Sequence, residues 1–259
     1  MSSQDSRRMF LGLATTSVVL AACRERAQLA PERTPPVPQP AASAEPAKKD
    51  DDGEDKDAKD AEDVGAVEDL MREHGVIRRI LVVYRESAVR LRQKPSPALA
   101  DALQKAAKLM QTFGEDYHEK ALEEAHLFPA VKKAGGPASN SIEALLAQHQ
   151  RGREITNYVL TVTQRPLGAV SAEPLARALE GFARMYEEHA AHEDTVVFQA
   201  WKKTMSKKQL DEMGELFEDI EHKTFGKDGF EDASAKIAGI EDGLGITLAS
   251  LLAAPPPTH

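Results

Sequence analysis

Four histidines are distributed along the chain in a pattern that suits a metal site. They are His74, His118, His149 and His189, and each falls near the middle of a different long helical segment. In an antiparallel bundle the middles of the helices meet at one level, so the four imidazoles would converge on one interior point. Imidazole is a common ligand of iron, zinc and copper. The distribution therefore predicts a metal centre, although one such histidine alone would indicate nothing.

Carboxylates accompany the histidines on the second and fourth segments. His189 and Glu193 are four residues apart, which places both side chains on one face of a helix. A short internal repeat aligns Phe128 with Phe198 at an offset of 70 residues. The same offset pairs Glu123 with Glu193, and it nominates Glu123 as the second acid of the centre.

The spacing on the second segment departs from that of the fourth. His118 lies five residues before Glu123, which puts the two side chains about 140° out of register on an ideal helix. A π-bulge near Ala121 would restore the facing pair, and such bulges are common at functional sites. In the alternative, the site is distorted and Glu119 or Glu124 contributes. We favour the bulge, and regular i→i+4 bonding through this stretch would exclude it.

Apolar spacing and helix breakers predict an all-α fold. The composition is rich in helix-forming residues, and only 5% of residues are aromatic. The four long segments are expected at Val67–Gln93, Ser96–Lys133, Ser139–Gln164 and Ser171–Met205. A shorter helix over residues 207–223 and a weak last helix near 231–242 follow. Short connections make an antiparallel up-down four-helix bundle, with a short extra C-terminal helix, the economical packing.

The first 23 residues have the pattern of an export signal. The run Ser6-Arg7-Arg8-Met9-Phe10-Leu11 resembles a twin-arginine signal, and a short apolar stretch follows it. Leu20-Ala21-Ala22-Cys23 resembles a bacterial lipobox, in which the cysteine is acylated. Cys23 is the single cysteine, which excludes an intramolecular disulfide. An ordinary signal peptide with an incidental cysteine is the alternative.

Composition divides the rest of the chain. Residues 24–63 are rich in proline and alanine and end in a run with nine acids and four lysines over 48–63, so we expect a disordered tether. The bundle is assigned to residues 64–232, and a weak helix and tail to 233–259. The formal net charge of −9 gives no electrostatic reason to expect nucleic-acid binding.

Taken together, these motifs resemble the hemerythrin, or HHE cation-binding, family over about residues 67–230. The resemblance is carried by Arg72-Glu73-His74, Asp116-Tyr117-His118, Glu123-Glu124, Leu127-Phe128-Pro129, Gln148-His149, His189-x-x-x-Glu193-Asp194 and Phe198. It implies a four-helix bundle that holds two non-haem iron ions. By the same resemblance the terminal ligands would be His74, His118, His149 and His189, and the bridging carboxylates Glu123 and Glu193.

The chain departs from the oxygen-carrying members at one position. Arg153 stands where those proteins have a further histidine, so a coordination position would be left for water, a side chain or a small molecule. This departure puts reversible oxygen carriage in doubt. A ferritin-like site needs Glu-x-x-His on two helices, whereas both such matches here fall on the second segment. His126 and His192 are expected on the surface or behind the ligands, and His222 outside the core.

These features predict a binding protein more than an enzyme. We expect a di-iron centre that captures oxygen or a related small diatomic molecule, for sensing, scavenging or storage. The alternative is a di-iron oxidoreductase acting on peroxide or another small oxidant, and a third possibility is a structural bundle whose histidines bind zinc or nothing. The expected location is outside the bacterial inner membrane, anchored to a membrane through lipid on Cys23. No protein partner is indicated.

Overall fold

The computed structural model describes residues 64–251, and these contain helices and no strand. The expected all-α fold is confirmed. The elements are α1 (Ala66–Gln93), α2 (Pro97–Leu109), η1 (Met110–Leu127), α3 (Phe128–Ala134), η2 (Pro137–Ser141), α4 (Ile142–Thr163), α5 (Ala169–His192), η3 (Glu193–Val197), α6 (Phe198–Lys202), α7 (Lys207–Phe225) and α8 (Gly229–Leu244). The predicted export signal, Cys23 and the tether lie outside the described residues.

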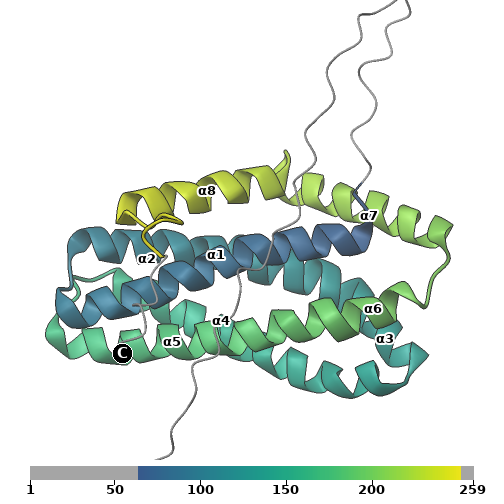
Figure 1. The fold of residues 1–259 in the computed structure, drawn as a ribbon, viewed down its shortest axis with the longest axis horizontal. Coiled ribbons are helices and arrows are strands. Elements are labelled where there is room, and N and C mark those ends of the chain that lie inside the picture. The colour runs from purple at the N-terminus through teal and green to yellow at the C-terminus, as the bar shows by residue number, and fades with distance from the viewer. Residues whose placement is uncertain (1–63, 252–259) are drawn as a thin grey trace, which may run out of the picture. The chain divides into compact units, whose positions relative to one another are not determined.

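Four long rods make up the bundle (Figure 1). They are α1, the continuous run of α2, η1 and α3, then α4, and finally the continuous run of α5, η3 and α6. Local chemistry sets where the second rod begins. Ser96 is its N-cap, as predicted, because its hydroxyl accepts a hydrogen bond of 3.2 Å from the backbone N–H of Leu99. Pro97 occupies the first turn, where its missing N–H leaves no bond unmade.

The first rod lies against most of the others and carries the longest apolar stripe. Leu70, Ile77, Ile80, Leu81 and Tyr84, which sequence spacing assigned to this stripe, are all at most 2% exposed. Each side chain of this size contributes about 1.5–3 kcal/mol when it is fully buried. This burial holds α1 against α5, α2 and α8. It also fixes the level along the bundle at which the polar side chains of α1 lie in the core.

The last helix is longer and better packed than its sequence indicated. α8 has 16 residues, and its buried Ala233, Ile237 and Ile240 join the core against α1 and α2. Arg79 on α1 also forms an ion pair with Glu241, with Nε 3.0 Å from Oε1. The predicted last helix is confirmed, over Gly229–Leu244 rather than residues 231–242, and it packs into the core. The domain boundary predicted after residue 232 falls inside α8. It was misplaced because an apolar face shared with two other helices is hard to recognise from a short glycine-containing segment.

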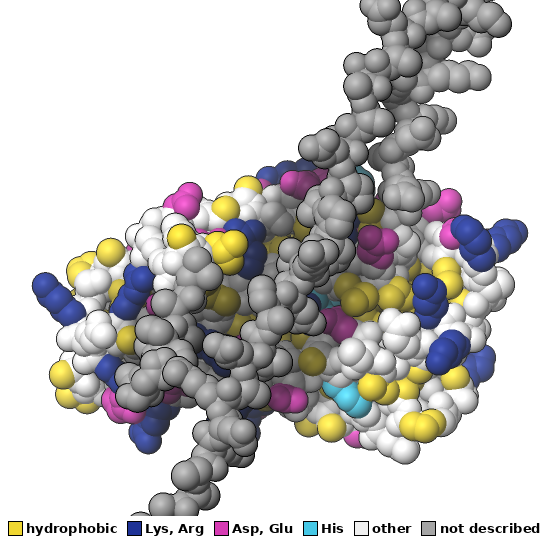
Figure 2. All heavy atoms as spheres, viewed as in Figure 1, with side chains coloured by type: hydrophobic (Ala, Val, Ile, Leu, Met, Phe, Trp, Pro, Cys, Tyr) yellow, Lys and Arg dark blue, Asp and Glu magenta, His cyan; other side chains and the backbone are white. Residues whose placement is uncertain are grey.

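The visible face of the bundle carries side chains of both charges, interspersed over the described residues (Figure 2). Among the helices of this part of the chain, none combines the length and the apolar character that crossing a membrane would require.

Candidate metal centre

Two stretches of π-helix bring the acidic residues to the centre of the bundle. η1 is π-helical and contains both His118 and Glu123, so the π geometry predicted there is confirmed. It extends over the whole of Met110–Leu127 rather than a single turn. The second stretch, η3, was not predicted. In both, a backbone N–H bonds five residues back: Phe128 to the carbonyl of Glu123, and Phe198 to that of Glu193.

Glu123 lies between two of the histidines. Its Oε1 is 3.4 Å from Nε2 of His118. Its Oε2 is 3.4 Å from Nε2 of His149. Since the two oxygens face different imidazoles, metal ions next to each imidazole would share this carboxylate. Glu123 therefore has the placement of a bridging ligand.

Glu193 also lies between two histidines, His189 and His74, but approaches both with the same oxygen. Its Oε2 is 3.0 Å from Nε2 of His189 and 3.5 Å from Nε2 of His74. Ligand atoms of Glu123, His149, His189 and Glu193 all lie within 4.8 Å of one another, and so do those of His74, His118 and Glu123. The structure thus brings all six predicted side chains together in two overlapping groups, either of which could hold a metal ion; Glu119, Glu124 and His149 form a third such group.

Buried polar atoms without hydrogen-bond partners indicate that these six side chains fit a cation. Among the described residues, both carboxylate oxygens of Glu123 and of Glu193 are buried without a hydrogen-bond donor, and so is Nε2 of His118. Both glutamates are 0% exposed. Burying a charged oxygen without a partner is costly, and native structures pair such groups or bind metal with them. A metal cation among the four imidazoles would satisfy all these atoms.

Each of the four histidines is also held by a contact at Nδ1, the ring nitrogen on the side away from the centre. Nδ1 lies 2.7 Å from Asp194 in His74, 2.5 Å from Glu73 in His118, 2.8 Å from Glu124 in His149 and 2.9 Å from Gln148 in His189. An Nδ1–H that donates to these oxygens leaves the Nε2 lone pair facing the centre, which is the tautomer a metal needs. The four imidazoles are therefore preorganised as ligands.

The two halves of the centre repeat each other. His74, Arg78, Phe198 and Asp194 correspond to His149, Arg153, Phe128 and Glu124. In each half the arginine pairs with the acid behind the histidine, and the phenylalanine stacks on the imidazole, at 5.3 Å and 5.5 Å between ring centroids. The internal repeat seen in the sequence is thus the visible part of an approximate two-fold arrangement.

The comparison with known proteins agrees with this geometry. Residues 65–201 match the model of the hemerythrin HHE cation-binding domain, which is more than half of the chain. The chain belongs to the hemerythrin HHE family. It is 44% identical over 188 residues to a protein of Mycobacterium bovis described as uncharacterized, and equally to proteins so described from two strains of Mycobacterium tuberculosis; the alignments cover 71% of each chain. No solved structure shows significant similarity to it.

The two acids weighed as alternative ligands lie on the outer side of the HHE centre. Glu124 bonds to Nδ1 of His149, not to the inward Nε2. Glu119 accepts a 2.5 Å hydrogen bond from the Tyr186 hydroxyl, and its other oxygen is 3.0 Å from the guanidinium of Arg153. Arg153 is thereby turned away from the centre. The π-helical turn explains the outcome, because it directs Glu123 inward in their place.

The remaining histidines lie away from the HHE centre. Nε2 of His192 is 2.7 Å from the Ser141 hydroxyl, and the ring of His126 is 6.1 Å from that of Phe217. Sequence reasoning missed the roles of Glu73, Gln148 and Arg78. Glu73 and Gln148 each precede a predicted ligand, and Arg78 follows His74 by four residues, as Arg153 follows His149. That shared spacing was the available signal.

Without metal, the carboxylates around His74 and His118 favour the protonated form of both imidazoles. Burial opposes the charged form of His74, yet the neighbouring carboxylates of Asp194 and Glu193 raise its pKa. Burial also opposes the charged form of His118, but Glu123 and Glu73 raise its pKa well above the usual value. Metal ligation requires neutral imidazole, so ions must displace these protons and bind less tightly as pH falls.

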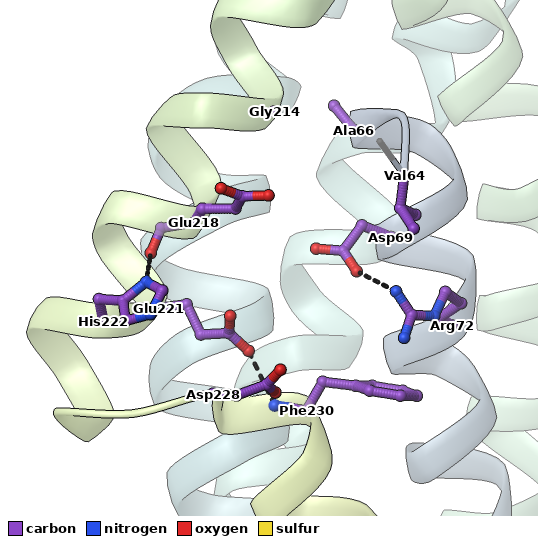
Figure 3. A pocket seen from close by; sticks show the side chains of 10 residues that line it. All are labelled: Val64, Ala66, Asp69, Arg72, Gly214, Glu218, Glu221, His222, Asp228 and Phe230. Atoms are coloured by element: carbon purple, nitrogen blue, oxygen red, sulfur yellow. Dashed lines mark hydrogen bonds and ion pairs between the residues drawn. The ribbon is translucent and has the colours of Figure 1, made fainter. Parts of the chain in front are cut away.

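A second acidic cluster lies beside the HHE centre, in a cavity of about 310 Å³ between α1, α7 and the start of α8 (Figure 3). In that view Asp69 and Arg72 project from α1 toward Glu221 on α7. The pKa of Asp69 is raised to about 7, first by burial and then by repulsion from Glu73 and Glu221. In the described part of the chain, the carboxylates of this cavity do not converge as metal ligands would. The cavity is therefore separate from the HHE centre.

Proposed function

We propose that this HHE domain holds two iron ions and binds oxygen or nitric oxide at them, for sensing, scavenging or storage. One observation carries the proposal: four inward imidazole nitrogens surround two fully buried carboxylates whose four oxygens lack any donor. Each ion would be held by two histidines, and the two ions would share both carboxylates. Six protein ligands cannot fill the coordination of two such ions, and positions remain for a small exogenous molecule.

The donor chemistry favours iron. Imidazole with carboxylate suits iron in both of its common oxidation states, whereas copper(I) and structural zinc sites usually include thiolates. The chain has one cysteine, at position 23, far in sequence from these ligands. Stacked Phe128 and Phe198 and complete burial of the histidines favour a small, uncharged ligand such as a diatomic gas.

Optical spectroscopy of the iron-loaded protein tests the proposal. After anaerobic reduction, addition of oxygen or nitric oxide should produce a charge-transfer band that is stable on the timescale of mixing. Glu193→Gln should lose at least one iron per chain and with it the band, because a bridging carboxylate is removed. The exposed Glu188→Gln on the same helix is the matched control and should behave as wild type. A featureless spectrum in an iron-replete wild type would rule out ligand binding, and sustained peroxide turnover would favour the oxidoreductase.

For its location, we propose export by the twin-arginine route and lipid attachment at Cys23. Ser6 to Leu11 and Leu20 to Cys23 support this in the sequence, and export of a folded domain would let the metal load first. Cys23→Ser should move the protein from the membrane fraction to the soluble exported fraction and abolish labelling with a palmitate analogue. Unchanged membrane association in this variant would contradict the anchor.

A further inference from the structure

The two halves of the centre differ in the group that stands behind one of the histidines. Behind three of the four histidines stands a carboxylate, whereas His189 has the neutral amide oxygen of Gln148 at 2.9 Å. Its counterpart in the other half is Glu73, whose Oε2 lies 2.5 Å from Nδ1 of His118. Glu73 and Gln148 occupy equivalent places, each immediately before a histidine of the centre. The arginine–acid and phenylalanine–imidazole contacts are shared by both halves, whereas Nε2 of His149 and Nε2 of His189 lie 3.0 Å apart.

Glu73 also differs from the other acids behind the histidines in having no arginine. Asp194 pairs with Arg78, and Glu124 with Arg153. Among the described residues, the single ion pair of Glu73 is with His118, and Glu73 is 0% exposed. Its charge is therefore directed to one imidazole and is weakly screened by solvent.

A carboxylate behind a ligating histidine makes the imidazole a stronger donor. It draws the Nδ1 proton toward itself and adds electron density at Nε2, and such contacts commonly change metal affinity by about 10–100-fold. A neutral amide fixes the same ring orientation without that gain. We propose that Glu73 and Gln148 act as positioning residues that make the two metal sites unequal, with the His74–His118 site binding its ion more tightly.

Glu119 is the remaining charge near the His149–His189 half. It is 3.9 Å from Nδ1 of His149, but its oxygens are taken by the Tyr186 hydroxyl and by Arg153. It forms no contact with His189. The local hydrogen bond to the imidazole, rather than the sum of charges around each half, therefore distinguishes the sites. This inference rests on the proposed two-metal function.

The test is a titration of metal-free protein with Co²⁺, which reports ligation optically, followed by anomalous diffraction at one equivalent. Wild type should bind two ions with constants about 10-fold or more apart, and the first ion should lie between His74 and His118. Glu73→Gln should bring the two constants within about threefold by weakening the first, and Gln148→Glu should do so by strengthening the second. The double variant should restore the difference and move the first ion to His149 and His189.

The outcomes separate this inference from the proposed function. If wild type binds fewer than two ions at these six residues, the two-metal function itself fails. If it binds two but the anomalous signal at one equivalent is divided evenly, the function stands and the inequality is refuted. Should Glu73→Gln not fold, Gln148→Glu alone decides, since an unchanged second constant would also refute it. The exposed Glu188→Gln should leave both constants as in wild type.

Discussion

Each imidazole of the centre is fixed by contacts that leave it little freedom. His74 is held at Nδ1 by Asp194 and stacked on Phe198, and His149 is held by Glu124 and stacked on Phe128. The sequence nominated the six inward residues through mid-helix histidines, the four-residue spacing of His189 and Glu193, the internal repeat that pairs Glu123 with Glu193, and the family resemblance. Their outer partners come from other helices, and a contact such as that of His74 with Asp194, 120 residues away, has no local signature.

At the residue scale, Asp69 should limit stability at neutral pH. Its pKa is raised from 3.8 to about 7 by burial and by Glu73 and Glu221. Since the folded pKa exceeds the unfolded one, its contribution is fully present below about pH 4 and is lost as pH rises to 7. Asp69→Asn should therefore raise the free energy of unfolding at pH 8 by about 1–2 kcal/mol, allowing for partial solvent screening.

Urea unfolding at several pH values measures this effect. At pH 4 the variant and wild type should agree closely, because Asp69 is protonated in the folded protein. The exposed Glu215→Gln on α7 is the control and should show no comparable gain at pH 8. A lower stability of Asp69→Asn at pH 8 would mean that the contact of Asp69 with Arg72, at 3.5 Å, outweighs the repulsion.

At the element scale, α4 and α5 pack closely where they flank the centre. Gly152 on α4 leaves room for Tyr186 on α5, because a Cβ at this glycine would lie 2.2 Å from the tyrosine hydroxyl. That hydroxyl in turn bonds to Glu119 on η1. One missing methyl group therefore allows a polar contact among three helices beside the metal centre.

Gly152→Ala should destabilise the protein by about 1–3 kcal/mol, the usual cost of overpacking a core. Gly181→Ala on α5 is the matched control. A Cβ at Gly181 meets nothing within 4 Å, so that change should be stabilising by about 0.5–1 kcal/mol through helix propensity. Urea unfolding of both variants measures the difference, and an increase in stability for Gly152→Ala would show that Tyr186 is free to move.

The elements were predictable to the extent that their signals were local. Pro97 with Ser96, and the apolar stripe of α1, marked rods that the structure confirms. The five-residue spacing of His118 and Glu123 indicated π geometry, but one pair cannot show that it extends through η1. η3 left no signal at all, because His189 and Glu193, the first residue of η3, keep ordinary α-helical spacing.

At the scale of the whole molecule, α7 and α8 cover one side of the bundle and complete the core (Figure 1). Phe217 from α7 and Ile237 from α8 are both at most 1% exposed. The helices that contribute no metal ligand therefore belong to the same folding unit as those that do. Their loss would expose the apolar back of α1 and α2, on which the position of His74 depends.

Ile237→Ala should lower the free energy of unfolding by about 2–5 kcal/mol, as for other large-to-small changes in a packed core. Leu248 is 85% exposed, and Leu248→Ala should change it by less than about 0.5 kcal/mol. Helical circular dichroism during urea unfolding should show one shifted transition for the first variant. A separate early transition, with the main one unmoved, would show α8 to be an independent appendage.

If these six side chains hold two iron ions side by side, X-ray absorption of the iron-loaded protein should detect the pair. We expect two irons per chain, nitrogen and oxygen neighbours, and an iron–iron separation of about 3.5–4 Å, as in other two-metal sites. One iron per chain, or iron atoms without a metal neighbour, would contradict it.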